Sequence, residues 1–214
     1  MCISIIYGLL RVLIIFRIIR IKKLFRLVKY REGGGVTMAT GFKNIVLGLI
    51  LATFHINLGT LQIVPSFVGW ILVAMGVDSI AKAEGNELFT KAKNISVLLI
   101  LLTLLGLIKV NPIITFRSPY MLPTLMALIE LFFIYYFFRG ITEMLKRKGK
   151  IKQVCDNEKM LSGYTILHII GILIMCICWL TSSSMTGALI GIYMVALRIY
   201  IIYRVNKTGK DVNK

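Results

Sequence analysis

The sequence predicts an all-α, polytopic helical membrane protein with six transmembrane helices, and three observations carry this prediction. Hydrophobic residues make up 57% of the 214 residues. Charged residues make up 16%, whereas a soluble domain carries about 25%. Six apolar runs approach the ~20 residues with which a helix crosses the ~30 Å hydrocarbon core of a bilayer. Charged or turn-forming segments separate these runs, and most basic residues lie in alternate segments.

Residues 38–214 form the predicted six-helix transmembrane domain. Its spans are expected at residues 44–58, 65–82, 94–108, 121–138, 164–180 and 186–203. The first two belong to one long apolar stretch, which NLGT at residues 57–60 and Pro65 divide, because these residue types favour turns. The first span is short, which favours tilt, local thinning of the bilayer or a partly re-entrant hairpin.

Residues 1–37 differ from the rest of the chain. Between Ile18 and Arg31, basic residues share one helical face and apolar residues share the other, which predicts a basic amphipathic helix at the membrane surface. A competing interpretation starts from REGGG at residues 31–35, the kind of peptide that a translated purine-rich ribosome-binding site gives. Met38 is then the true start and residues 1–37 are an over-extended upstream region. Peptides from residues 1–30 in the native protein would exclude this interpretation.

Lysine and arginine residues are divided unequally between the two sides of the predicted membrane domain. Beyond Met38, fifteen flank the spans on the side of the C-terminal tail, and two, Lys109 and Arg117, lie on the other side. Basic residues collect on the cytoplasmic side of membrane proteins, so both termini are predicted to be cytoplasmic. The Ile- and Lys-rich, Pro-poor composition is typical of a low-GC bacterial genome, so we expect a bacterial plasma membrane.

Several function classes are disfavoured by the same sequence. The net charge of +17 suggests nucleic-acid binding, but its basic residues lie between apolar runs, where membrane topology requires them. Cys176 and Cys178 point away from each other on a helix, and no CxxC or other metal-ligand spacing occurs. No HExxH, GxSxG or P-loop motif is present. We therefore expect no nucleic-acid partner, enzyme activity, metal or cofactor.

Four ionisable side chains are interpreted as intramembrane: Glu130, His55, His168 and Arg198. Such residues are costly in hydrocarbon and are functional-site hypotheses by default. Counted from the inner boundary at ~1.5 Å per residue, their heights are roughly 13 Å for Glu130, 16 Å for His55, 9 Å for Arg198 and 8 Å for His168. His55 is therefore the expected first partner of Glu130, Arg198 the second and His168 the last.

Three interpretations of this polar intramembrane site are open. In the first, Arg198 extends to the interface, the histidines bond to backbone or hydroxyl groups, and Glu130 is neutral or meets water. In the second, Glu130 pairs with His55 or Arg198 as a structural tie between helices. In the third, the four groups line a path for a proton, a cation or a polar solute.

Small residues in the spans are candidates for close helix packing, because two backbones approach most closely where side chains are small. Small-xxx-small pairs and one small residue near Glu130 are the candidates: Gly187 and Gly191, Gly48 and Ala52, and Ala127.

The leading function hypothesis is a small permease-like or channel-like transport protein with a polar site around Glu130. The alternative is a non-transporting accessory or scaffold subunit that binds partners or anionic lipid headgroups through basic cytoplasmic loops. Expected partners are the bilayer, and a second copy or another membrane subunit. A water-reachable cavity lined by Glu130 and a histidine would support transport, whereas a dry bundle with Glu130 tied to Arg198 would remove that support.

Overall fold

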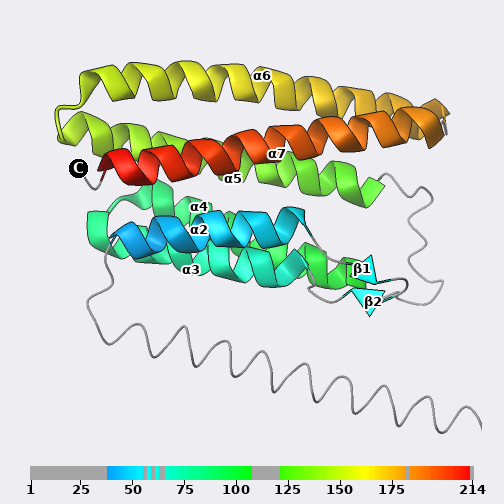
Figure 1. Ribbon diagram of the computed structural model, residues 1–214, viewed down its shortest axis with the longest axis horizontal. Coiled ribbons are helices and arrows are strands. Elements are labelled where there is room, and N and C mark those ends of the chain that lie inside the picture. Colours follow the sequence, from blue (N-terminus) through cyan, green and yellow to red (C-terminus); the bar gives the residue numbers. More distant parts are fainter. Residues whose placement is uncertain are drawn as a thin grey trace, which may run out of the picture. The chain divides into compact units, whose positions relative to one another are not determined.

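Almost all of the described residues are helical. The computed structural model describes residues 38–54, 57–58, 61–62, 66–107, 121–181 and 184–212, and all of them belong to one compact unit. The described helices are α2 (Met38–Thr53), α3 (Ser66–Glu84), α4 (Glu87–Leu107), α5 (Met121–Arg147), α6 (Ile151–Thr181) and α7 (Ser184–Val212) (Figure 1). Strands β1 (Asn57–Leu58) and β2 (Leu61–Gln62) form an antiparallel pair between α2 and α3. The predicted amphipathic helix within residues 1–37 lies outside the described residues.

The six described helices pack in a ring that follows the order of the chain. Each helix contacts the next one, and α7 contacts α2. Short connections at residues 85–86 and 148–150 make the helices on either side of them antiparallel (Figure 1). The start of α2, the α3–α4 and α5–α6 connections and the end of α7 therefore lie together at one end of the ring. We call this the basic end, because most of the lysines and arginines beyond Met38 lie there.

Four helical segments are long and apolar enough to cross a membrane: Ser66–Glu84, Leu122–Arg147, Ile151–Ile177 and Leu189–Val212. Helix α2 is apolar but shorter, with 16 residues. Helix α4 begins with Glu87, Lys91 and Lys93 in its first two turns, before its apolar part. This set of helices fits a helical membrane protein.

The outer surface of the ring agrees with a lipid environment. Large apolar side chains are exposed on every described helix except α3, among them Leu101 on α4, Phe132 on α5, Ile166 on α6 and Ile192 on α7. A soluble monomer rarely exposes contiguous apolar surface of this kind. A bilayer would cover these side chains.

Aromatic side chains from α5 fill the middle of the ring. Phe137 contacts the ring of Phe42 on α2 at a centroid distance of 6.3 Å and the ring of Phe89 on α4 at 5.9 Å. Phe133 stacks on Phe137 and meets the ring of Trp70 on α3 at 5.6 Å. All five side chains are at most 3% exposed. Helix α5 therefore joins helices that are not its neighbours in the ring.

Local sequence signals fix the connections at the basic end. Gly149 has a φ of 68°, and Lys150 N–H donates to the Leu145 carbonyl, which is the Schellman arrangement that ends α5. Gly85 has a φ of 62° and ends α3. Asn86 caps α4, because its Oδ1 accepts a hydrogen bond from Leu88 N–H at 2.8 Å. These tight turns hold the polar ends of the helices close to one another.

Candidate functional site

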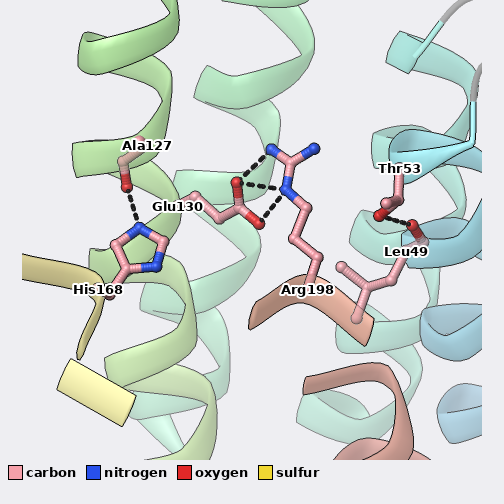
Figure 2. A network of polar contacts seen from close by, with 6 residues as sticks. All are labelled: Leu49, Thr53, Ala127, Glu130, His168 and Arg198. Carbon is pink, nitrogen blue, oxygen red and sulfur yellow. Dashed lines mark hydrogen bonds and ion pairs between the residues drawn. The ribbon is translucent and has the colours of Figure 1, made fainter. Parts of the chain in front are cut away.

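Glu130 on α5 and Arg198 on α7 form a bidentate ion pair inside the ring (Figure 2). Arg198 Nε donates to Glu130 Oε1 at 2.9 Å, and Arg198 Nη2 donates to Glu130 Oε2. The Glu130 side chain is 3% exposed and that of Arg198 is 26% exposed. The planar guanidinium matches a carboxylate in this geometry, which gives the strongest kind of side-chain hydrogen bond.

The pair explains how a carboxylate can be buried in the apolar part of a span. An unpaired charge in this position is costly, whereas a partner with good geometry offsets much of the desolvation cost. The three hydrogen bonds use both carboxylate oxygens of Glu130. The arrangement is therefore a structural ion pair that joins α5 to α7.

His168 on α6 bonds to the backbone of α5, and no hydrogen bond joins it to the ion pair among the described residues. Its Nε2 donates to the carbonyl oxygen of Ala127 at 3.0 Å, one turn before Glu130 (Figure 2). Because a carbonyl only accepts, Nε2 carries the hydrogen and Nδ1 is a bare acceptor when the ring is neutral. His168 is fully buried, and its Nδ1 has no hydrogen-bond partner among the described residues.

Tyr164 lies one turn before His168 on α6 and faces the same interior. The two rings are 5.2 Å apart between centroids. The Tyr164 side chain is 2% exposed, and its hydroxyl is buried without a hydrogen-bond partner among the described residues. Tyr164 was not predicted from the sequence as a site residue, although its spacing of four residues from His168 places it on the same helical face.

The structure brings together three of the four predicted intramembrane residues. Helices α5, α6 and α7 contribute Glu130, His168 and Arg198, while His55 lies outside the described residues. The sequence ranked His55 above Arg198 as the partner of Glu130, but the described partner is Arg198. Counting residues gives depth in the membrane, but it does not say which helices face each other. A long arginine side chain also spans the height difference of roughly 4 Å that the counting predicted.

The predicted small-residue pairs have different surroundings. Gly48 lies at the contact of α2 with α3, where a Cβ added to it would meet the Gly69 carbonyl at 2.5 Å. A Cβ on Gly69 would collide with the backbone of Ala52, so Ala52 belongs to the same contact. A Cβ on Gly191 would meet nothing within 4 Å among the described residues. Gly187 lies in α7, at a position whose surroundings are not described.

Other small residues have packing roles that the sequence analysis did not assign. Gly41 and Gly76 continue the contact of α2 with α3, because a Cβ on Gly41 would meet the Gly76 carbonyl at 2.9 Å. Gly171 lets α6 approach α7, where its Cβ would meet Met194 Sδ at 2.9 Å. The signal was a spacing of seven residues, Gly41 to Gly48 and Gly69 to Gly76, which repeats on one helical face. Ala127 is 4% exposed and lies where His168 of α6 reaches α5.

A second polar region lies at the basic end, where α5, α6 and α7 continue past their apolar parts. We call residues 139–159 and 204–212 the polar cap. Asn157 Nδ2 donates to Thr142 Oγ1 at 2.7 Å and to the Phe138 carbonyl at 3.1 Å, which joins α6 to α5. Arg204 Nη2 lies 3.1 Å from Asp156 Oδ2, which joins α7 to α6. These contacts hold the three helix ends in one arrangement.

The polar cap contains an open hollow of about 420 Å³. Three cationic and two anionic side chains, with three uncharged ones, line it: Lys152, Arg204, Lys207, Asp156, Asp211, Leu145, Gln153 and Thr208. Two polar atoms in this lining, Gln153 Oε1 and Arg204 Nε, are buried and have no hydrogen-bond partner among the described residues. A buried donor and a buried acceptor without partners are costly, and an incoming polar group would satisfy them.

No group of three or more His, Cys, Asp or Glu side chains that could hold a metal ion occurs in the described part of the chain. No known protein family matches the sequence, and no curated protein or solved structure is similar to it. Function is therefore argued from the two polar regions alone.

Proposed function

We propose that the chain is a six-span membrane accessory or scaffold subunit that binds a partner protein through its polar cap. Helices α2 to α7 are the six spans, and both termini are cytoplasmic. The observation that carries this proposal is the polar cap itself, a cross-linked extension of three helices with a charged hollow. A transport protein needs a polar path through the membrane. The charged atoms of Glu130 and Arg198 bond to each other, so the pair does not provide such a path.

The gathering of basic residues at one end of the ring supports this topology. The starts of α2, α4 and α6 and the ends of α3, α5 and α7 meet there, as contacts between Asn86 and Glu143 and between Lys150 and the Asp211 carbonyl illustrate. In membrane proteins, lysines and arginines collect in the segments on the cytoplasmic side. This pattern supports the proposal that the basic end faces the cytoplasm.

Cys155 gives a direct test of this topology, since it is exposed and lies in the polar cap. A membrane-impermeant thiol reagent should label Cys155 in inside-out vesicles and leave it unlabelled in intact cells, as read by peptide mass spectrometry. Labelling of Cys155 in intact cells would place the cap outside and reject the topology.

The interior of the ring supports the accessory role over transport. Aromatic rings on α5 fill the centre, and both oxygens of Glu130 are bonded to Arg198. Both carboxylate oxygens therefore already accept hydrogen bonds and need no further ligand. We therefore assign the pair to joining α5 and α7, and the partner-binding role to the cap.

Photo-crosslinking in native membranes tests partner binding. A photoreactive amino acid at Lys152, which lines the hollow, should give one discrete cross-linked protein. The same group at Ile166, which is 57% exposed on the apolar part of α6, is the matched control and should give only lipid adducts. Lys207→Glu should abolish the protein product at Lys152, because it reverses a charge in the hollow. A product that survives Lys207→Glu, or lipid adducts alone at both positions, would reject the cap as a docking site.

Permease-like transport is the second candidate, and one observation favours it. Tyr164 and His168 leave two buried polar atoms without described partners, on the helix that packs between α5 and α7. Such orphan groups inside a membrane protein are satisfied by a water or a polar solute when one is present. If water or a solute binds to Tyr164 and His168, then α5, α6 and α7 enclose a small polar site beside the ion pair.

Accessibility of position 168 separates the two candidates. The double variant Cys155→Ser/His168→Cys places a thiol in the interior, and a small hydrophilic thiol reagent reaches that thiol only through water. Labelling at position 168 would favour a solute path and count against the closed interior. Protection from the reagent, with Cys155 of the parent chain labelled normally, is the result that the accessory proposal expects.

A further inference from the structure

A groove of about 490 Å³ runs between α2 and α7, at the point where the ring closes. On α2 its lining follows one helical face, with Lys43 followed by Val46 and Leu47 and then by Ile50. On α7 its lining includes Asn206 and Lys210 near the end of the helix. The groove is therefore charged towards the basic end and apolar towards the middle of the bundle.

The two lysines of the groove differ from most basic residues around them. Lys82, Lys91, Lys93, Lys146, Lys148, Arg204 and Lys207 each lie within 4.0 Å of a carboxylate. Neither Lys43 nor Lys210 has such a partner among the described residues. Two cations left without counter-charges at the mouth of one groove predict an anionic ligand.

The apolar part of the groove determines what kind of anion fits. Val46 packs against the core, while Leu47 and Ile50 are 49% and 37% exposed and face outward from the bundle. Phe42 and Gly209 line the groove beside the lysines, and a Cβ on Gly209 would meet Phe42 Cβ at 2.8 Å. A ligand that fills this shape has a negative head and an apolar tail.

We propose that this groove binds one anionic phospholipid of the cytoplasmic leaflet. Its phosphate lies between Lys43 and Lys210, with the Asn206 amide as a further donor, and one acyl chain follows Val46, Leu47 and Ile50. This inference uses the membrane topology of the proposed function, but it is independent of partner docking at the polar cap, which involves other residues.

Residues 1–37 are the competing occupant, because they lead directly into α2. Their sequence contains eight lysines and arginines and one acidic residue, Glu32. A segment of this charge is repelled by Lys43 and Lys210, whereas a phosphate is attracted. Charge complementarity therefore favours the lipid.

Native mass spectrometry of the full chain in detergent tests the proposal. The protein is offered equal amounts of phosphatidylglycerol, which is anionic, and phosphatidylcholine, which is zwitterionic. A lysine near an anionic lipid contributes roughly fivefold in affinity, so the double variant Lys43→Gln/Lys210→Gln should bind phosphatidylglycerol about 30-fold more weakly. Leu47→Trp, which keeps both lysines and fills the apolar part, should lower the binding of both lipids.

Lys82→Gln/Lys91→Gln is the matched control. It removes the same charge at the same end of the ring, from exposed lysines on α3 and α4 that do not line the groove. Phosphatidylglycerol binding should stay within twofold of the parent chain. An equal loss in this control, or no preference of the parent chain for phosphatidylglycerol, would overturn the proposal. A photoreactive group at Leu47 that cross-links to residues 1–37 instead of lipid would overturn it as well.

Discussion

The two sides of the ring are held together by different physical means. Helices α2 and α3 meet backbone to backbone, with Gly41, Gly48 and Ala52 against Gly69 and Gly76. Helices α5, α6 and α7 also share apolar packing, but polar side chains join them as well, including Glu130 with Arg198 and Asn157 with Thr142. Close backbone approach gives van der Waals contact along the whole crossing, whereas a polar tie acts at single points.

The two kinds of helix contact differ in whether a ligand can bind at them. A crossing packed through glycines leaves no room for a ligand and tolerates little change. A crossing made by long polar side chains leaves atoms that other groups can bind, such as those of Tyr164, Gln153 and Arg204. The sites with unpartnered polar atoms accordingly lie at α5, α6 and α7. The contact of α2 with α3 is structural, and the lipid groove uses the other face of α2, towards α7.

The largest expected effect is at the glycine crossing. Gly48→Leu places side-chain atoms where the Gly69 carbonyl and the Val73 backbone already lie. We expect a loss of about 4 kcal/mol in the free energy of unfolding, because backbone has to move. Unfolding in mixed micelles, followed by tryptophan fluorescence, measures it. Gly191→Leu makes the same change at an open position and should change stability by less than about 0.5 kcal/mol. Equal losses in the two variants would contradict the claim that the contact of α2 with α3 requires glycine at position 48.

The next effect is at the ion pair. Arg198→Met leaves Glu130 buried without its partner, which should cost about 3 kcal/mol. The double variant Glu130→Met/Arg198→Met removes both charges and should recover most of that loss, because an apolar pair of similar size is tolerated in the same place. The same micelle assay measures both variants. A double variant as unstable as Arg198→Met would contradict the claim that the loss comes from leaving Glu130 without its partner.

Asn157→Ala tests the link between α5 and α6 in the polar cap. Asn157 is 2% exposed and donates to both Thr142 Oγ1 and the Phe138 carbonyl. Losing both hydrogen bonds and leaving their acceptors buried should cost about 1 to 2 kcal/mol. Hydrogen–deuterium exchange should rise in the cap and stay unchanged in α2 and α3. Faster exchange in α2 and α3 as well would mean that the two sides do not unfold separately.

The smallest effect is expected for Tyr193→Phe. The Tyr193 hydroxyl donates to the Leu167 carbonyl at 2.8 Å on the exposed side of the α6–α7 contact. Hydrogen bonds between helices in membranes contribute about 0.6 kcal/mol on average, so the change should lie near that value. A loss larger than about 2 kcal/mol would exceed what such a bond can supply.

The sequence allowed the coarse architecture to be predicted and left the contacts open. Run length and charge indicated a helical membrane protein, because hydropathy alone decides which segments suit hydrocarbon. The helical ends of α5, α6 and α7 were not predicted, since Arg139 to Lys159 has the composition of a loop. It is helical because Gly149 closes a tight turn and polar contacts between the helices hold both of its halves.

The sequence suggested which residues could form a polar site, but it did not determine which of them pair. Depth counting selected Glu130, Arg198 and His168 as candidate residues but ranked Arg198 behind His55 as the partner of Glu130, whereas the described partner is Arg198. Rotation of a helix about its axis sets the partner, and a uniformly apolar span carries little information on rotation. The hollow of the polar cap and the groove at Lys43 are formed by segments that lie far apart in the sequence. Local sequence patterns therefore could not predict them.

The most direct test of the closed ion pair is flux across the membrane. Vesicles that hold the purified protein are loaded with a pH-sensitive dye and given a proton or cation gradient. The closed interior predicts that vesicles with the parent chain, vesicles with Glu130→Gln and empty vesicles lose the gradient at the same rate. A faster loss with the parent chain that Glu130→Gln abolishes would contradict the tie and assign the pair to a transport path.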